Sequence, residues 1–481
     1  MRKPPARTRR QKWRTAEPKS WLEGLLPFAA GAAAGSLGLA LAGRRLFVRM
    51  VRKSLQILMT DPYDENLWEL YSAVSRFGLQ PLAETELRAA QGTVIQRPLG
   101  SPKRFPDFCN LMFNIAQLET MPTPLSAPIG LKVTIGPRAS KPLQIDIPIM
   151  ISGMAYGWAL SEGAKVALAM GASAAGTASN TGQGPWLDSE RKAAKKLIYQ
   201  YHRGHWGKTE EIFRQSDAIE IQFGQGANAG LSAVFEAELM DDRLRRQFEV
   251  KRGEPAISEA RHQDIQRPDD LVEVVKRLRG LSGGVPIGVK FGAGQQLEQD
   301  MQYALRADVD YIAIDGAAAA TKGSPPITED DFGLPTVFAV VRASRYLQEQ
   351  QASGKVSLII SGGLKTPGDF LKALALGSDA VYIGAAALFA MAHTQSLHAL
   401  PCEPPTQAVW YGGKAASTFD PKAGGRSLER YLRACADEMA EGLRALGKTR
   451  LQDVGLDDMF ALDRTTAEIC AVPLGYTAAT T

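Results

Sequence analysis

Short apolar runs alternate with helical stretches from about residue 145 to about residue 390. Amphipathic patterns with the helical period lie between them, for example at 161–172, 269–280 and 368–377. Continuous apolar strands that alternate with helices are typical of a parallel sheet covered on both faces, and eight such units predict an α/β fold, the (β/α)8 TIM barrel. The predicted strands are 147–152, 173–177, 197–201, 218–223, 286–291, 311–316, 356–361 and 380–384.

The same patterns divide the chain into four predicted segments. The first, 1–53, is basic and includes a predicted transmembrane helix at about 22–43. A helical and irregular lead-in follows at 54–135 and shows no chemical motif, and the barrel takes 136–425. An amphipathic pattern at 426–446 predicts that the tail, 426–481, is helical and packs on the barrel.

The N-terminal segment contains 20 residues without a charge, 24–43. As a helix they would span about 30 Å, the thickness of one bilayer core. We therefore expect a single-pass anchor in the cell membrane with the barrel in the cytoplasm, although basic residues on both flanks leave the topology open. Two alternatives stay open. Arg9-Arg10 and Ala40-Leu41-Ala42 resemble parts of a cleaved export signal, and the run also fits an Ala-rich soluble helix.

Charge is distributed unevenly along the chain. The net charge of +5 is the sum of +11 in residues 1–53 and −6 in the remainder, so the body of the protein lacks the basic excess of a nucleic-acid-binding protein. The four cysteines are far apart, and no pair has the C-x2-C spacing of a zinc or iron–sulfur site. We therefore expect no metal site and no disulfide scaffold.

Candidate chemistry follows from the strand ends, because barrel enzymes place their sites there. Gly362-Gly363 follows the seventh predicted strand and Gly384-Ala385 follows the eighth, where barrels often bind a phosphate through backbone N–H groups. Each glycine pair alone also fits a tight turn. Lys290 lies at the inner end of an apolar strand, which is costly unless an anion meets it or its ammonium reaches solvent or a salt bridge.

Six motifs in this region resemble the FMN-binding glutamate synthase family, which comprises the flavin-binding barrel of the glutamate synthase large subunit and its stand-alone relatives. They occur in the family's order and span about half of the chain. The motifs are PIMISGMAYG (148–157), SNTGQG (179–184), GQGA (224–227), GVK (288–290), SGGLKT (361–366) and GAAAL (384–388).

The resemblance implies an FMN cofactor and assigns residues to it. Asn180 and Gln222 would bond the polar edge of the flavin ring, and Lys290 would be the catalytic cation beside it. Ser152, Gly153, Met154 and Ala155 would back the ring, and Ser361, Gly362, Gly363, Gly384 and Ala385 would bind the phosphate.

The resemblance also implies a reaction, the reduction of 2-iminoglutarate, formed from 2-oxoglutarate and ammonia, to glutamate. A dicarboxylate needs cations, for which the candidates are Lys322, Lys365, Arg261 and His262. The family's glutaminase domain is absent from this sequence, so ammonia would come from solution or from a partner subunit, and electrons from a donor protein or reductase. The region where the family carries an iron–sulfur motif, 391–402, holds only Cys402, so no iron–sulfur cluster is expected.

Two loops depart from the family pattern, at 228–230 and 317–322. These loops would face the substrate, so two alternatives stay open. One is an FMN barrel that acts on a different amino or oxo acid. The other is a flavin-binding membrane protein without turnover, which the loss of polar groups at 317–320 favours.

Overall fold

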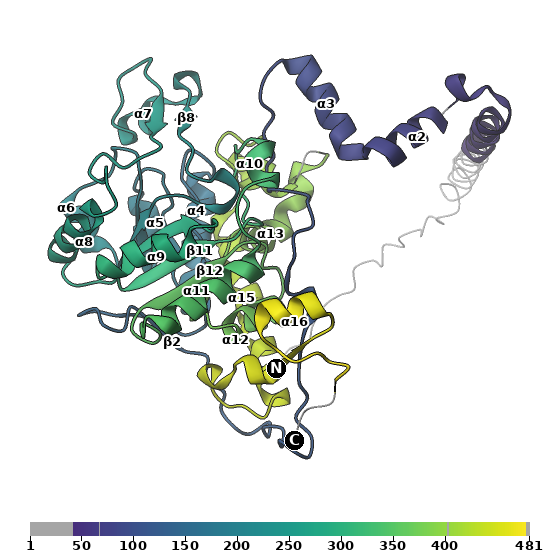
Figure 1. Cartoon of the computed structure of the whole chain (residues 1–481). Coiled ribbons are helices and arrows are strands. Elements are labelled where there is room, and N and C mark those ends of the chain that lie inside the picture. Colours follow the sequence, from purple (N-terminus) through teal and green to yellow (C-terminus); the bar gives the residue numbers. More distant parts are fainter. Residues whose placement is uncertain (1–41, 67, 402–403, 478–481) are drawn as a thin grey trace, which may run out of the picture. The chain divides into compact units, whose positions relative to one another are not determined.

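The computed structural model describes residues 42–66, 68–401 and 404–477, which fall into two compact units that divide between Val94 and Ile95. The described part of the first unit contains three α-helices, at 42–60, Trp68–Phe77 (α2) and Leu79–Gln91 (α3), and the short 3-10 helix Tyr63–Glu65 (Figure 1). The side chains of Asn66 and Trp68 donate to the carbonyls of Ile57 and Leu58 at 2.8 Å each, which satisfies acceptors at the end of the first helix.

Within the described residues, no helix is both long enough and apolar enough to cross a bilayer. The transmembrane helix predicted at about 22–43 lies outside the described residues except for its last two positions, and so does most of the proposed export signal.

The second unit is built around eight parallel strands in the order β4-β13-β12-β11-β10-β7-β6-β5. Between the two end strands, the backbone N–H of Ile151 donates to the carbonyl of Ala178 at 3.0 Å, which nearly closes the barrel and confirms the predicted fold class. The strands are β4 (Ile149–Ile151), β5 (Ser179–Asn180), β6 (Leu197–Tyr201), β7 (Ala218–Gln222), β10 (Ile287–Gly292), β11 (Tyr311–Asp315), β12 (Ser357–Ser361) and β13 (Ala380–Ile383).

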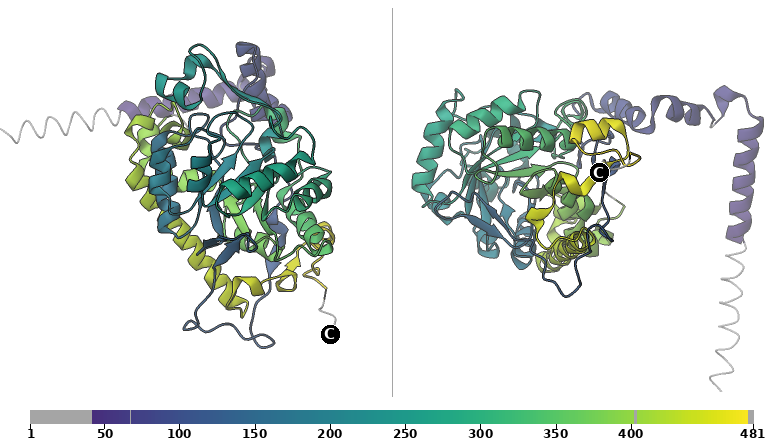
Figure 2. Two further views of the ribbon diagram at one scale, coloured as in Figure 1. Left: turned by 90° about the vertical axis from the view of Figure 1, so that its left-hand side faces the viewer. Right: turned by 60° about the horizontal axis from the view of Figure 1, so that its bottom comes forward.

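Helices surround these strands in both views of Figure 2. The apolar sides of the helices and strands form one continuous core, as expected when a parallel sheet is covered on both faces. The helices are α4 (Glu162–Ala174), α5 (Asp188–Ala193), α6 (Glu210–Gln215), α7 (Asp242–Gln247), α8 (Asp270–Leu281), α9 (Leu297–Arg306), α10 (Pro326–Asp330), α11 (Thr336–Glu349), α12 (Pro367–Ala375), α13 (Ala385–Ala392), α14 (Pro404–Val409), α15 (Pro421–Ala445) and α16 (Arg464–Cys470).

Short antiparallel pairs accompany the barrel. They join β1 (Leu111–Phe113) to β14 (Met459–Ala461), β2 (Val133–Ile135) to β3 (Leu143–Ile145), and β8 (Ala233–Phe235) to β9 (Ala256–Ser258). The amphipathic helix predicted at 426–446 is α15, which begins five residues earlier. It packs on α4, and Gly171 permits the close approach because a Cβ there would lie 2.8 Å from the Leu428 side chain.

The second strand was predicted at the wrong place. Residues 173–177 are the end of α4 and its turn, and the strand is the two-residue β5 that follows at Ser179–Asn180. Ser161 caps the helix at its start, and Gly176, with φ of +76°, stands just after its end. The small residues between these signals were mistaken for a buried strand because short Ala-rich runs have no clear period.

Candidate functional site

A cavity of about 1570 Å³ opens at the carboxyl ends of the barrel strands. Strand ends provide its floor, and three further segments contribute to its wall, at 96–109, 231–239 and 318–323. Of the residues predicted from the sequence, it is lined by Ser152, Gly153, Met154, Ala155, Lys290, Lys322, Ser361, Gly362, Gly363, Lys365, Gly384 and Ala385.

Lys290 is a buried cation on the floor of this cavity, with only 3% of its side chain exposed. Its Nζ lies 3.3 Å from Oδ1 of Asp315 and 5.4 Å from the centre of the Tyr382 ring. Burial acts to lower the pKa of the Lys290 ammonium, but the carboxylates of Asp315 and Glu220 outweigh it and hold that pKa above its ordinary value. Lys290 therefore stays protonated at neutral pH and places an ammonium, paired with Asp315, at the cavity floor.

Behind Lys290, a polar network surrounds Glu220, which is fully buried on β7. Its carboxylate accepts from Asn180 Nδ2 at 3.0 Å, from Gln200 Nε2 at 2.8 Å and from the Tyr382 hydroxyl at 2.9 Å. Burial, followed by the charge of Glu220, raises the pKa of Tyr382 well above its usual range, so this hydroxyl stays a donor. These bonds satisfy a charge that would otherwise be very costly inside the barrel.

The structure places Asn180 and Gln222 behind the cavity wall. Asn180 is 1% exposed, and besides Glu220 its Oδ1 accepts from the backbone N–H of Gly182 at 2.9 Å. Gln222 is fully buried and donates to Gln225 Oε1 at 3.2 Å. Gln200 and Gln225 line the cavity instead, so the two predicted amides support the lining side chains.

Glycines at the ends of β12 and β13 leave backbone groups open to the cavity. Gly362 and Gly363 have φ of +118° and +70°, and Cβ atoms there would lie 2.6 Å from Thr336 Oγ1 and 2.8 Å from Ala318 Cβ. Gly384 precedes the first turn of α13, where no side chain caps the helix. Backbone N–H groups beside the positive end of a helix dipole are an arrangement that can bind an anion.

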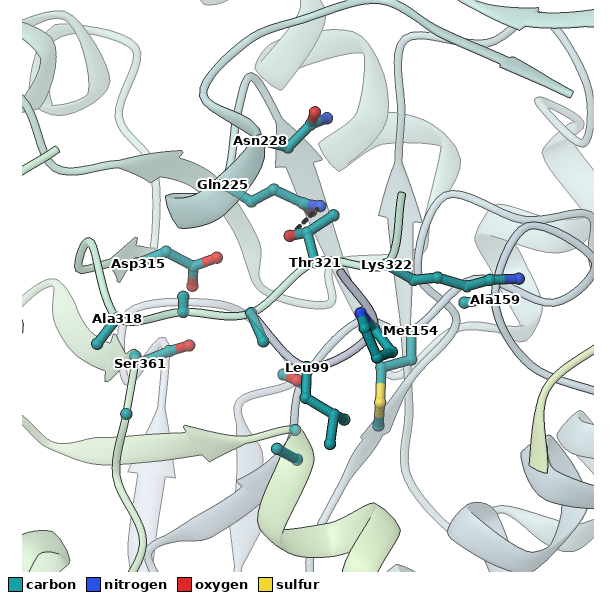
Figure 3. A pocket seen from close by; sticks show the side chains of 18 of the residues that line it. Leu99, Met154, Ala159, Gln225, Asn228, Asp315, Ala318, Thr321, Lys322 and Ser361 are labelled. Carbon is teal, nitrogen blue, oxygen red and sulfur yellow. Dashed lines mark hydrogen bonds between the residues drawn. The ribbon is translucent and has the colours of Figure 1, made fainter. Parts of the chain in front are cut away.

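Figure 3 shows side chains that line the cavity, among them Gln225, Thr321 and Lys322. Gln225 Nε2 donates to Thr321 Oγ1 at 2.9 Å, which joins the loop after β7 to the loop after β11. The next residue, Lys322, donates from Nζ to the Trp158 carbonyl at 3.2 Å and lies 4.6 Å from the centre of the Trp410 ring. Burial lowers the pKa of Lys322. Among the described residues, no carboxylate lies within ion-pair distance of it.

The other three residues predicted to bind the substrate, Lys365, Arg261 and His262, do not lie in one cavity. Lys365 lines the main cavity beside Gly363 and is exposed. Arg261 and His262 line a second, smaller cavity between β7, β10 and α9, because the chain has left the strand end by that point. His262 Nε2 lies 2.8 Å from the Gln222 carbonyl, and burial lowers the pKa of His262 to about 4, so the ring is neutral. Neither residue reaches the main cavity.

The lead-in, where the sequence showed no chemical motif, provides part of the cavity wall. Residues 96–109 run along it, and Arg97 binds Asp330 of α10 with two bonds of 2.6 and 2.9 Å. Gln200, Glu220, Asp315 and Tyr382 were also missed. Asp315 and Glu220 could have been found as acidic residues inside apolar strands, whereas no local signal marks the lead-in.

The comparisons with known proteins agree with this geometry. The family model described as a conserved region in glutamate synthase matches residues 112–449. The chain is 34% identical over 415 residues to a glutamate synthase large subunit-like protein of Rhizobium meliloti, covering 82% of this chain and 93% of that protein. It is 31% identical over 339 residues to the archaeal NADPH glutamate synthase of Methanocaldococcus jannaschii, covering 68% of this chain and 66% of that protein.

Solved structures with the same fold include a mutant flavocytochrome b2 with pyruvate bound. Its TM-score is 0.50 at 15% sequence identity, and the match covers 89% of this chain and 93% of that one. At this identity the likeness concerns the fold.

Proposed function

Because the chain belongs to the glutamate synthase family, we propose that it is an FMN-dependent oxidoreductase that reduces 2-iminoglutarate, formed from 2-oxoglutarate and ammonia, to glutamate. One observation carries the proposal. The charged, buried Lys290 and the open glycine loops at Gly362-Gly363 and Gly384 line the same cavity. A flavin phosphate needs such loops, and a reduced flavin ring needs such a cation.

The residues present fit FMN. Side chains larger than hydrogen at Gly362 or Gly363 would collide with Thr336 or Ala318, so these positions are kept bare and their N–H groups can meet phosphate oxygens. The start of α13 adds N–H groups that no side chain caps, and Lys365 adds an exposed ammonium on the same side. When bound, FMN would supply the hydride transfer.

The chain's own residues prepare the cavity for this chemistry. Lys290 holds a positive charge that Asp315 keeps in place, and Ser152, Gly153, Met154 and Ala155 provide a wall beside it. The bonds of Glu220 to Asn180, Gln200 and Tyr382 hold the floor in one arrangement. Charges and dipoles that are fixed before the reaction stabilise developing negative charge at no reorganisation cost.

Lys322 is our candidate for binding a substrate carboxylate. Its ammonium is half-buried between Trp158 and Trp410, and within the described chain its partners are a carbonyl and an aromatic ring rather than an acid. A substrate carboxylate would supply a counter-charge for Lys322. The attraction between the two charges would be stronger than in water because the site is partly desolvated. In this proposal ammonia comes from solution or a partner subunit, electrons come from a donor protein or reductase, and the protein is held at the cell membrane.

The proposal is tested on the purified full-length chain. We expect a flavin absorbance band and an extracted cofactor with the mass of FMN. After anaerobic reduction, 2-oxoglutarate plus ammonia should reoxidise the protein with formation of glutamate, while either compound alone should not. A colourless protein that does not take up added FMN would contradict the cofactor. Bound FMN without reoxidation by any oxo acid, with or without ammonia, would contradict the enzymatic function.

One observation favours a second candidate, an oxo acid with an apolar side chain. Leu231, Val234 and Leu239 line the cavity and are 42%, 51% and 64% exposed, which leaves an apolar rim without a partner in the described chain. A dicarboxylate makes no use of such a rim. Faster reoxidation by the imino acid of an apolar oxo acid than by that of 2-oxoglutarate would favour this candidate.

A further inference from the structure

Helix 42–60 in the first unit has two chemically distinct faces. With 3.6 residues per turn, its polar residues fall within a sector of about 100°. The exceptions are Arg44 and Ser54, which lie on the opposite side. The polar sector contains Arg45, Arg49, Arg52, Lys53, Gln56 and Thr60, and the apolar sector contains Leu46, Phe47, Val48, Met50, Val51, Leu55, Ile57, Leu58 and Met59. The helix contains no acidic residue.

The apolar face of this helix has no cover among the described residues of its unit. Phe47 is 62% exposed and Met59 is 83% exposed, and no hydrophobic side chain among described residues 42–94 is buried. Fifteen of the 33 exposed large hydrophobic side chains of the described chain lie in this stretch. Since the stability of a helix in a protein comes mainly from burial of its apolar face, this face requires an occupant.

We propose that helix 42–60 lies in the plane of an anionic phospholipid surface, with its apolar face in the acyl boundary and its basic face among the head groups. Two features favour lipid over another protein. The apolar sector covers more than half of the wheel, wider than the seam of a helix pair. The polar sector contains four cations and no anion, which complements a negatively charged surface.

Neighbouring residues agree with this location. Trp68 and Tyr71, in the helix that follows, are 44% and 61% exposed, and aromatic residues with a polar edge are typical of membrane interfaces. With five cations over 44–60, the helix itself is unsuited to cross the hydrocarbon core. The inference is independent of the anchor expected at 22–43 and of the enzymatic reaction.

The test measures how deep each face of the helix lies, using the full-length chain on vesicles. Single spin labels are placed through Leu46→Cys, Met50→Cys and Leu55→Cys on one face, and through Arg49→Cys and Gln56→Cys on the other. The parent carries Cys109→Ser, because Cys109 is exposed, and its residual labelling is subtracted. Collision rates with oxygen and with a water-soluble nickel complex are compared on phosphatidylcholine vesicles with and without phosphatidylglycerol.

On the anionic vesicles we expect the two rates to oscillate with the helical period. Labels on the apolar face should favour oxygen, and labels on the basic face should favour nickel. Three results would overturn the proposal: free access of nickel to both faces, lipid-like values on both faces, or protection of the apolar face from both reagents, which would indicate cover by protein.

A charge variant separates the roles of the two faces. Changing Arg45, Arg49, Arg52 and Lys53 to Gln together should expose the Leu46 label to nickel on the anionic vesicles. The matched control changes four exposed cations of the second unit to Gln, namely Lys192, Arg246, Lys276 and Arg430, and alters net charge by the same amount. Equal behaviour of the two variants would refute attraction between the basic face and the anionic lipid.

Discussion

Lys290 and Asp315 pair across the neighbouring strands β10 and β11, with 3.3 Å between Nζ and Oδ1. In the parallel register Lys290 is opposite Ala313, so Asp315 lies two residues further along on the same face of the sheet. Both side chains are almost fully buried, at 3% and 6% exposure. The register of two strands, rather than any local motif, therefore creates the charged centre of the cavity.

Replacing only one residue of this pair should destabilise the protein more than replacing both. Lys290→Met leaves the Asp315 and Glu220 carboxylates buried without their cation, and we expect a loss of about 3 kcal/mol in unfolding free energy. The double variant Lys290→Met/Asp315→Asn should recover part of that loss. Urea unfolding of the single and double variants measures both effects, and additive losses would show that the two groups do not interact.

The glycine loop after β12 should tolerate no side chain. Gly363→Ala adds a Cβ at φ of +70° that would meet Ala318 at 2.8 Å, so we expect FMN affinity to fall at least tenfold. Gly280→Ala is the matched control, because a Cβ at that position of α8 meets nothing within 4 Å. Flavin fluorescence titration of the two proteins gives the affinities, and equal affinities would argue against phosphate binding at this loop.

Lys322 should act on substrate binding. Lys322→Met keeps the length of the side chain but removes the charge, and we expect KM for the oxo acid to rise about tenfold, with a smaller change in kcat. Lys276→Met, on the exposed surface of α8, is the control. Steady-state kinetics distinguish the two constants. An unchanged KM would remove Lys322 from the substrate site.

Asp379, just before β13, should make stability depend on pH. Burial raises the pKa of Asp379 to about 6, although its Oδ2 accepts from the backbone N–H of Leu358 at 2.7 Å. Because the folded pKa is above the unfolded one, the unfolding free energy should decrease as pH rises from about 4 to about 6.

Asp379→Asn keeps an acceptor for Leu358 and cannot ionise. We expect it to be more stable than the natural chain by about 2 kcal/mol above pH 6 and similar to it near pH 4. Urea unfolding across this range tests the difference. A constant difference at all pH values would attribute the effect to packing.

Sequence patterns predicted most of the barrel because each buried strand is a continuous apolar run with helical periods between the runs. Seven of the eight strands occur where they were predicted. Only β5 was misplaced, since a two-residue strand has no period of its own. Lys290 was recognised because a lysine in an apolar strand contradicts its surroundings.

The pattern could not show how side chains divide between the cavity and the wall behind it. Asn180 and Gln222 are at strand ends, as predicted, yet Asn180 donates to the buried Glu220 and Gln222 lies behind Gln225. Gln200 occupies the lining position instead. Such choices depend on hydrogen bonds formed in the folded barrel, such as those around Glu220, and these have no signature in the linear order of residues.

The position of residues 96–109 in the cavity wall has a practical consequence. The conserved region begins at residue 112, but the wall of the cavity includes residues from Gln96 onward, held by Arg97 on Asp330. A shortened protein starting at residue 112 would keep every barrel strand and still have an incomplete site. The segment needed for a complete cavity is therefore longer than the region matched by the family model. Truncated proteins that keep the cavity should begin upstream of residue 96.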